Sequence, residues 1–209
     1  MNAQRFRIRP CTPQDEKAVY EVCLQTGDSG QNATRLYSDP RALGHIYVGP
    51  YLKIEPELAF VLEDDISVCG YVLGALNSRK FYDAYLTQWL PEIRRTHPGP
   101  TGNPVTWSAT EKIYYEYYHP TIYYPASFND YPSHLHIDLL PRAQGLGFGT
   151  RMIATLIAEF EKRDSPGVHL ALSSANRGAE RFYQRLGFVE LARLGCSDPQ
   201  TVFMGKRLE

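Results

Sequence analysis

The last third of the chain has the most regular pattern of hydrophobic and polar positions. Apolar residues at every second position predict strands, and apolar residues three and four apart predict helices. The predicted elements are strand 134–140, helix 150–163, strand 168–173, helix 177–186, and strands 188–194 and 201–206. This β-α-β-α-β order predicts strands that join one sheet and helices that cover it.

The first 95 residues predict a second set of elements with a hairpin at its centre. Thr12-Pro13-Gln14-Asp15 has the residue types that begin a helix, and Asp39-Pro40 repeats the signal. Asp64-Asp65-Ile66 separates two β-rich runs at the spacing of an antiparallel hairpin. The predicted elements are strand 6–9, helices 12–26 and 39–52, strands 58–63 and 67–76, and helix 80–95. Together the two halves predict a mixed sheet with helices on both faces, in a single domain over residues 1–209.

An aromatic-rich insertion at about 97–132 interrupts this pattern. It begins at the breaker cluster His97-Pro98-Gly99-Pro100, and 9 of the 25 residues from 107 to 131 are aromatic. Three acids accompany one base in it: Glu111, Glu116 and Asp130 with Lys112. Acidic and aromatic groups favour a lid that binds a cation such as an ammonium or a polyamine. The alternative is that the tyrosines pack against the sheet, or against a second subunit in a homodimer.

The composition narrows the class of protein and of its partners. The chain is 43% hydrophobic and 22% charged, which is typical of a globular protein and excludes disorder. Its 22 basic and 23 acidic residues exclude a surface that binds nucleic acid or a membrane by charge alone, so we expect a small partner. No apolar stretch reaches the roughly 18 residues of a membrane span. The four cysteines form no C-x-x-C pair, which predicts no metal site and a reducing, cytoplasmic setting.

A glycine-rich loop lies between the strand at 134–140 and the helix that follows it. Its sequence is Gln144-Gly145-Leu146-Gly147-Phe148-Gly149. Free amides at a helix N-terminus bind phosphate oxygens, and glycines let the backbone approach a ligand, so a diphosphate suits this loop. A plain tight turn is the alternative. The loop lacks the Gly-Lys-Ser/Thr of an ATP-binding loop and the G-x-G-x-x-G spacing of a dinucleotide loop.

Two motifs in this region resemble those of a known family. Gln144-x-x-Gly147-x-Gly149, preceded by Leu139-Leu140-Pro141, resembles the pyrophosphate loop of the GNAT acyltransferases. The pattern N-x-x-A-x-x-F-Y-x-x-x-G-F from Asn176 to Phe188 is similar to the second coenzyme-binding motif of that family. The resemblance implies a GNAT-type α/β (α+β) fold with a mostly antiparallel sheet. It also implies an N-acetyltransferase that uses acetyl-CoA as cosubstrate, without a metal, to acetylate a primary amine of a small molecule or peptide by direct attack on the thioester.

The resemblance also implies roles for individual residues. The amide of Leu139 would polarise the thioester carbonyl, and Asn176 would meet the pantetheine amides. Tyr183 would be the general acid, because a phenol with a pKa near 10 returns a proton to a thiolate; its alternative role is that of a core aromatic. The implied coenzyme-binding residues are Leu139, Leu140, Pro141, Gln144, Gly145, Leu146, Gly147, Phe148, Gly149, Thr150 and Asn176.

The candidates for the general base lie on the strand before the loop. Period-two alternation places His134, His136 and Asp138 on one face of that strand. Asp138 is the first choice because it is next to Leu139, and His136 is the second because its reference pKa near 6.5 suits a base at neutral pH. A solvated strand face or structural histidines are the alternatives. More remote candidates are Glu63, Glu111 and Asp28.

A narrower resemblance leaves two functions open. Ile8-Arg9-Pro10, residues 60–64 and residues 69–74 resemble the acetyltransferase-like C-terminal domain of the animal O-GlcNAc hydrolase and its bacterial relatives. That resemblance implies an alternative function as a non-catalytic acyl-CoA-binding module. The intact glycine loop and Tyr183 favour an active, bacterial-type enzyme. A different enzyme that uses ATP or NAD is a third, more distant hypothesis.

Overall fold

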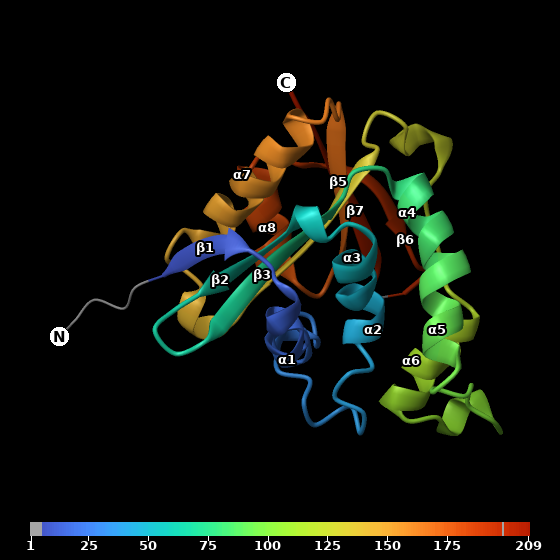
Figure 1. Ribbon diagram of the computed structural model, residues 1–209. Helices are drawn as coiled ribbons and strands as arrows, with labels where there is room; N and C mark the ends of the chain where they lie inside the picture. The colour runs from blue at the N-terminus through green and yellow to red at the C-terminus, as the bar shows by residue number, and fades with distance from the viewer. Residues whose placement is uncertain (1–5, 198) are drawn as a thin grey trace.

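Seven strands form one mixed sheet in the computed structural model, which describes residues 6–197 and 199–209. The strand order is β1-β2-β3-β4-β5-β7-β6 (Figure 1). The strands are β1 (Arg7–Pro10), β2 (Ala59–Glu63), β3 (Val68–Ala75), β4 (Ser133–Leu139), β5 (Gly167–Ser173), β6 (Val189–Leu194) and β7 (Thr201–Arg207). The predicted mixed, mostly antiparallel sheet is therefore confirmed. Within the described ranges, no helix combines the length and the apolar character needed to cross a membrane.

The parallel pair β4–β5 separates soon after it begins. Every other neighbouring pair in the sheet is antiparallel. Pairing of β4 with β5 is confined to Ser133 with Val168 and His134 with His169. The rest of β4, up to Leu139, stays paired with β3 alone. The sheet is thus open between β4 and β5 at the end that leads into the glycine loop.

Helices cover both faces of the sheet, as the sequence predicts. The helices are α1 (Glu16–Thr26), α2 (Gly44–Tyr47), α3 (Gly49–Ile54), α4 (Ser78–Ala84), α5 (Leu90–Arg94), α6 (Ala109–Tyr118), α7 (Phe148–Glu161) and α8 (Arg177–Arg185). A Cβ added at Gly74 of β3 would lie 2.7 Å from Leu156 Cδ1, so α7 packs on the face of Gly74. The neighbouring odd-numbered residues of β3 point to the opposite face, which α1 covers.

Of two long helices predicted from the sequence, one is wrong and the other is confirmed with a local distortion. The region predicted as helix 39–52 begins with turns and then forms α2 and α3, with a break at Val48. Pro50 explains the break, because proline has no amide hydrogen and its ring clashes with the preceding helical turn. The helix predicted over 80–95 is confirmed as an uninterrupted helical segment, in which α4 continues through a π-helical turn at Tyr85–Trp89 into α5. In Figure 1, α4, α5 and α6 stand together along one side of the molecule.

Part of the aromatic insertion anchors α6 to the rest of the protein. The hydroxyl of Tyr117 donates to the carbonyl of Ala42 at 2.9 Å, and that of Tyr114 donates to Asp39 Oδ2 at 2.9 Å. Tyr117 is fully buried. These contacts assign a packing role to two of the insertion's tyrosines, and they hold α6 beside the segment that leads into α2.

A buried histidine predicts a loss of stability in acid. His45 is 6% exposed, and burial, followed by the charges of His97 and Arg41, lowers its pKa to about 4. The unfolded chain takes up this proton near pH 6.5 while the folded chain does not, so stability falls as the pH drops from about 6.5 to about 4. We expect His45 to contribute on the order of 3 kcal/mol to this fall. Urea unfolding across this range should show a shallower pH dependence for His45→Gln, and equal slopes would contradict the assignment.

Candidate active site

A cavity of about 570 Å³ opens where β4 leaves β5. Its wall includes Asp138, Tyr183 and, from the predicted coenzyme-binding set, Leu139, Gln144, Gly145, Gly147, Gly149, Thr150 and Asn176. Leu140, Pro141, Leu146 and Phe148, also in that set, do not line it. Leu140 is buried and its amide donates to the carbonyl of Cys69, so its role is to position the strand end. The cavity brings the loop and two catalytic candidates to one place.

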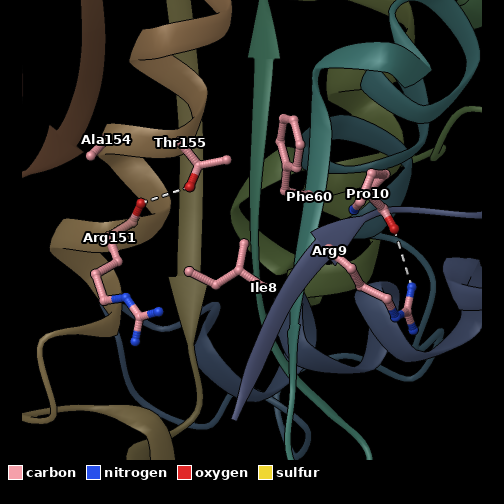
Figure 2. A pocket seen from close by; sticks show the side chains of 7 residues that line it. All are labelled: Ile8, Arg9, Pro10, Phe60, Arg151, Ala154 and Thr155. Atoms are coloured by element: carbon pink, nitrogen blue, oxygen red, sulfur yellow. Dashed lines mark hydrogen bonds between the residues drawn. The ribbon is translucent and has the colours of Figure 1, made fainter.

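A second cavity, of about 510 Å³, lies between β1, β2 and α7 (Figure 2). Its lining residues are Ile8, Arg9, Pro10, Phe60, Arg151, Ala154 and Thr155. The guanidinium of Arg9 forms ion pairs with Asp15 and Glu63. None of the predicted catalytic or coenzyme-binding residues lines this cavity, and we assign the site to the cavity at the strand opening.

The glycine loop is shaped to bind an anion. Gly145 and Gly147 have φ angles of +72° and +80°, a region that glycine adopts without strain. Gly147 is the N-cap of α7, so the first amides of the helix and the positive end of its dipole face the cavity. The side-chain amide of Gln144 donates to the carbonyl of Leu139 at 2.7 Å, which ties the loop to the strand end. These features fit the pyrophosphate of a coenzyme.

The amide of Leu139 points into the opening between the strands. Leu140 N–H donates to the carbonyl of Cys69 at 2.8 Å, toward β3. Successive backbone amides in a strand alternate in direction, so that of Leu139 points away from β3, where β5 has already diverged. It can therefore donate to the carbonyl oxygen of a bound acyl group, in the way that the sequence resemblance implies.

Asp138 and His136 are joined by a tyrosine that the sequence did not single out. Tyr71 of β3 lies opposite Asp138 in the sheet, and its hydroxyl donates to Asp138 Oδ2 at 2.5 Å. The same hydroxyl lies 3.0 Å from His136 Nε2. Because the hydroxyl has one proton, His136 Nε2–H is the donor in that second contact. His136 thus supports the pair, and Asp138 is the better placed group to accept a proton.

Burial and the charge of Asp138 keep the Tyr71 hydroxyl and the Cys23 thiol protonated. Burial, reinforced by the charge of Asp138, holds the pKa of Tyr71 well above its usual value. The same two causes raise the pKa of the Cys23 thiol, which comes from α1. Sγ of Cys23 and one ligand atom each of His136 and Asp138 lie within 4.8 Å of one another, a set that can hold a metal ion. The metal-free site expected from the sequence stays a prediction.

Tyr183 combines a buried ring with a place in the cavity wall. The residue is 8% exposed, and burial, followed by the charge of Asp138, raises the pKa of its phenol. Phe182, its neighbour on α8, also lines the cavity and packs against the backbone of Gly149. The Tyr183 phenol therefore keeps its proton at neutral pH and has a proton to donate, while its raised pKa makes it a weaker acid than a free phenol.

Other residues considered from the sequence have structural roles. His134 is buried, and its ring stacks on Tyr82 at 5.2 Å while Nδ1 contacts Ser78 Oγ at 2.8 Å. Glu63 is paired with Arg7 and Arg9. Glu111 accepts hydrogen bonds from Ser108 and closes the N-terminus of α6. Asn176 Oδ1 caps α8 by accepting from Ala179 N–H at 3.0 Å, which orients its side-chain amide in the cavity wall.

Comparisons with known proteins agree with this geometry. A model of the acetyltransferase (GNAT) family matches residues 106–188. The O-GlcNAcases of Rattus norvegicus and Mus musculus are each 27% identical over 204 residues, which is 97% of this chain and 22% of theirs. The chain thus spans less than a quarter of the length of these curated relatives.

Two solved structures have the same arrangement of elements. The crystal structure of SsHAT is 36% identical and has a TM-score of 0.87, with 97% of this chain and 98% of that chain covered. The structure of yncA from Salmonella typhimurium with its cofactor acetyl-CoA is 17% identical and has a TM-score of 0.56, with 98% and 94% covered. The second likeness shows the fold alone.

Proposed function

Because the chain belongs to the GNAT acetyltransferase family, we propose that it is an N-acetyltransferase that transfers an acetyl group from acetyl-CoA directly to a primary amine. The observation that carries the proposal is the single cavity shared by the glycine loop, Asp138 and Tyr183. Such a cavity can hold the pyrophosphate at one end and present the thioester to an acid and a base at the other.

The residues suggest one role for each chemical step. Leu139 N–H donates to the thioester oxygen as negative charge develops there when the amine nitrogen attacks the carbonyl carbon. Asp138 accepts one proton from the substrate ammonium before the attack and later releases it to solvent, and the nitrogen loses its second proton to solvent as the amide forms. As the carbon–sulfur bond breaks, Tyr183 gives its proton to the thiolate and recovers one from solvent after release of the products. Acetylated amine and free coenzyme A result, without an oxidant or reductant.

The O-GlcNAcase relatives make a non-catalytic acyl-CoA-binding module the second candidate function. Both functions predict that acetyl-CoA raises the melting temperature of the protein, because the ligand binds the folded state. Only the N-acetyltransferase predicts that acetyl-CoA is consumed. Thiol release from acetyl-CoA, measured over a panel of amines, should exceed the rate without protein. Stabilisation by the coenzyme with no turnover on any amine would favour the binding module.

Replacing Tyr183 with phenylalanine tests the proposed acid. The variant keeps the buried ring and removes the proton donor, so turnover should fall by roughly 10-fold to 1,000-fold. The affinity for acetyl-CoA should change little, which calorimetry can check. Tyr124→Phe, the same substitution at a phenol that does not line the cavity, is the matched control. Full activity of Tyr183→Phe would reduce Tyr183 to a packing residue.

We also propose that the protein works in the cytoplasm. The support is its cysteine chemistry, because Cys11, Cys23, Cys69 and Cys196 are all free thiols. Fractionation of cells that express the chain, followed by thiol labelling of the exposed Cys196, tests this proposal. Recovery outside the cytoplasm or in an oxidised form would contradict it.

A further inference from the structure

The side chain of Glu116 is an unpaired carboxylate in the aromatic insertion. It lies on α6, inside the insertion, and its residue is exposed. In the part of the chain that the structure describes, it has neither a hydrogen bond nor an ion pair. The surrounding protein nevertheless raises its pKa by partial desolvation. A crowded carboxylate without a partner is costly to keep ionised, and a bound cation would offset that cost.

Three tyrosines lie around this carboxylate. The charge of Glu116 raises the pKa of the phenols of Tyr37, Tyr47 and Tyr85. For each phenol, only burial raises the pKa more than this charge does. Their hydroxyls have no hydrogen-bond partner among residues 6–197 and 199–209. Tyr85 is 7% exposed. Within those ranges, His134 Nε2 is the only side-chain nitrogen or oxygen that is both fully buried and without a hydrogen bond. The unpartnered hydroxyl of Tyr85 is therefore accessible. We name Glu116, Tyr37, Tyr47 and Tyr85 the Glu116 patch.

The Glu116 patch is continuous with the proposed base. The ring of Tyr47 stacks on that of His136, with centroids 5.5 Å apart and planes inclined by 27°. His136 in turn contacts Tyr71 and lies 3.3 Å from Asp138. A substrate amine at Asp138 would therefore lie near His136, whose ring stacks on that of Tyr47, and Tyr47 is a tyrosine on which the charge of Glu116 acts.

The charges that act on the patch are mainly negative. Besides Glu116, Asp28 raises the pKa of Tyr37. Among the largest charge effects on the patch tyrosines within the described residues, the cation is Arg94, which acts on Tyr85. Its guanidinium is engaged elsewhere, because Nε donates to the carbonyl of Tyr117 at 2.7 Å and the group lies over the ring of Tyr118. Aromatic faces with an unpaired carboxylate are the chemistry that binds an ammonium.

We propose that the acceptor is a primary amine with a second positive charge, which the Glu116 patch binds while the reacting amine lies at Asp138. The inference rests on the proposed function and names the substrate class for the same site. A free diamine or polyamine and a peptide with neighbouring lysines share this chemistry. The experiment separates these two sources.

The test compares diamines with monoamines of equal carbon number in the wild type and in Glu116→Gln. Wild-type kcat/KM should be at least 10-fold higher for diaminobutane or a longer diamine than for butylamine. Glu116→Gln should raise KM for the diamine about 10-fold and leave kcat unchanged, and it should leave both constants unchanged for butylamine. A dilysine peptide is the second arm, and the acceptor with the larger Glu116 dependence identifies the source.

Glu111→Gln is the matched control, because it removes a charge from the same helix while glutamine still closes the helix cap. It should retain the wild-type preference. Equal kcat/KM values for diamine and monoamine, or an unchanged KM in Glu116→Gln, would overturn the inference and leave the proposed function intact. Absence of turnover on every amine would count against the function. Calorimetric titration of diaminobutane into the coenzyme-bound protein then decides the inference: binding that Glu116→Gln weakens supports it, and equal affinity overturns it.

Discussion

Replacing Gly147 with aspartate should raise the dissociation constant of acetyl-CoA by roughly 100-fold or more, because like charges brought together at a binding site cost several kcal/mol. Gly147 is the N-cap of α7 and lines the cavity, so the new carboxylate would meet the pyrophosphate. A Cβ at Gly147 meets no atom within 4 Å, and the substitution therefore does not displace the neighbouring protein. Calorimetric titration with acetyl-CoA measures the effect.

Gly147→Asn is the matched control for this variant. Asparagine has the same size and imposes a similar backbone strain at a φ of +80°, but it adds no charge. Its affinity should stay within about 10-fold of the wild type, since one factor of ten corresponds to about 1.4 kcal/mol. Equal losses in the two variants would attribute the effect to the backbone, and no loss in either would place the pyrophosphate elsewhere.

Replacing Asp138 with asparagine should lower kcat/KM for an alkylamine by roughly 100-fold to 1,000-fold. A primary alkylamine has a pKa near 10.4, so only about one molecule in a thousand is nucleophilic at neutral pH without a base. Asparagine has nearly the same shape and can still accept the hydrogen bond from Tyr71, but it cannot take up the proton. Steady-state kinetics with saturating acetyl-CoA measures the loss.

An acceptor that needs no base provides the discriminating control. For an amine whose conjugate acid has a pKa below the assay pH, the Asp138→Asn variant should lose far less activity than for the alkylamine. If Asp138 had only a structural role, Asp138→Asn would lose the same fraction of its activity with both acceptors. His136→Gln should have the smaller effect of the two variants, because His136 donates to Tyr71. A larger loss in His136→Gln than in Asp138→Asn would transfer the role of base to the histidine.

The binding loop and the orientation of the catalytic strand follow from local features of the sequence. The glycine spacing between Gln144 and Gly149 restricts the backbone itself, so a cavity beside the loop was predictable. Alternation along β4 likewise places His136 and Asp138 on one face, because successive side chains of a strand point in opposite directions. The helix predicted over 39–52 failed where Pro50 intervenes, and the helix predicted over 80–95 formed with a π-helical turn that the sequence pattern did not indicate.

The partners of the catalytic residues depend on contacts between distant segments. Tyr71 reaches Asp138 because the register of β3 on β4 pairs them across 67 positions, and Cys23 joins them only because α1 crosses the same face of the sheet. Register and helix placement are decided by the burial of whole faces, and no local spacing encodes them. The sequence alone therefore determined the glycine loop between strand and helix, and it made Asp138 the first candidate for the base. The tertiary structure alone decided that Tyr71 donates a hydrogen bond to Asp138 and that the ring of Tyr47 stacks on His136.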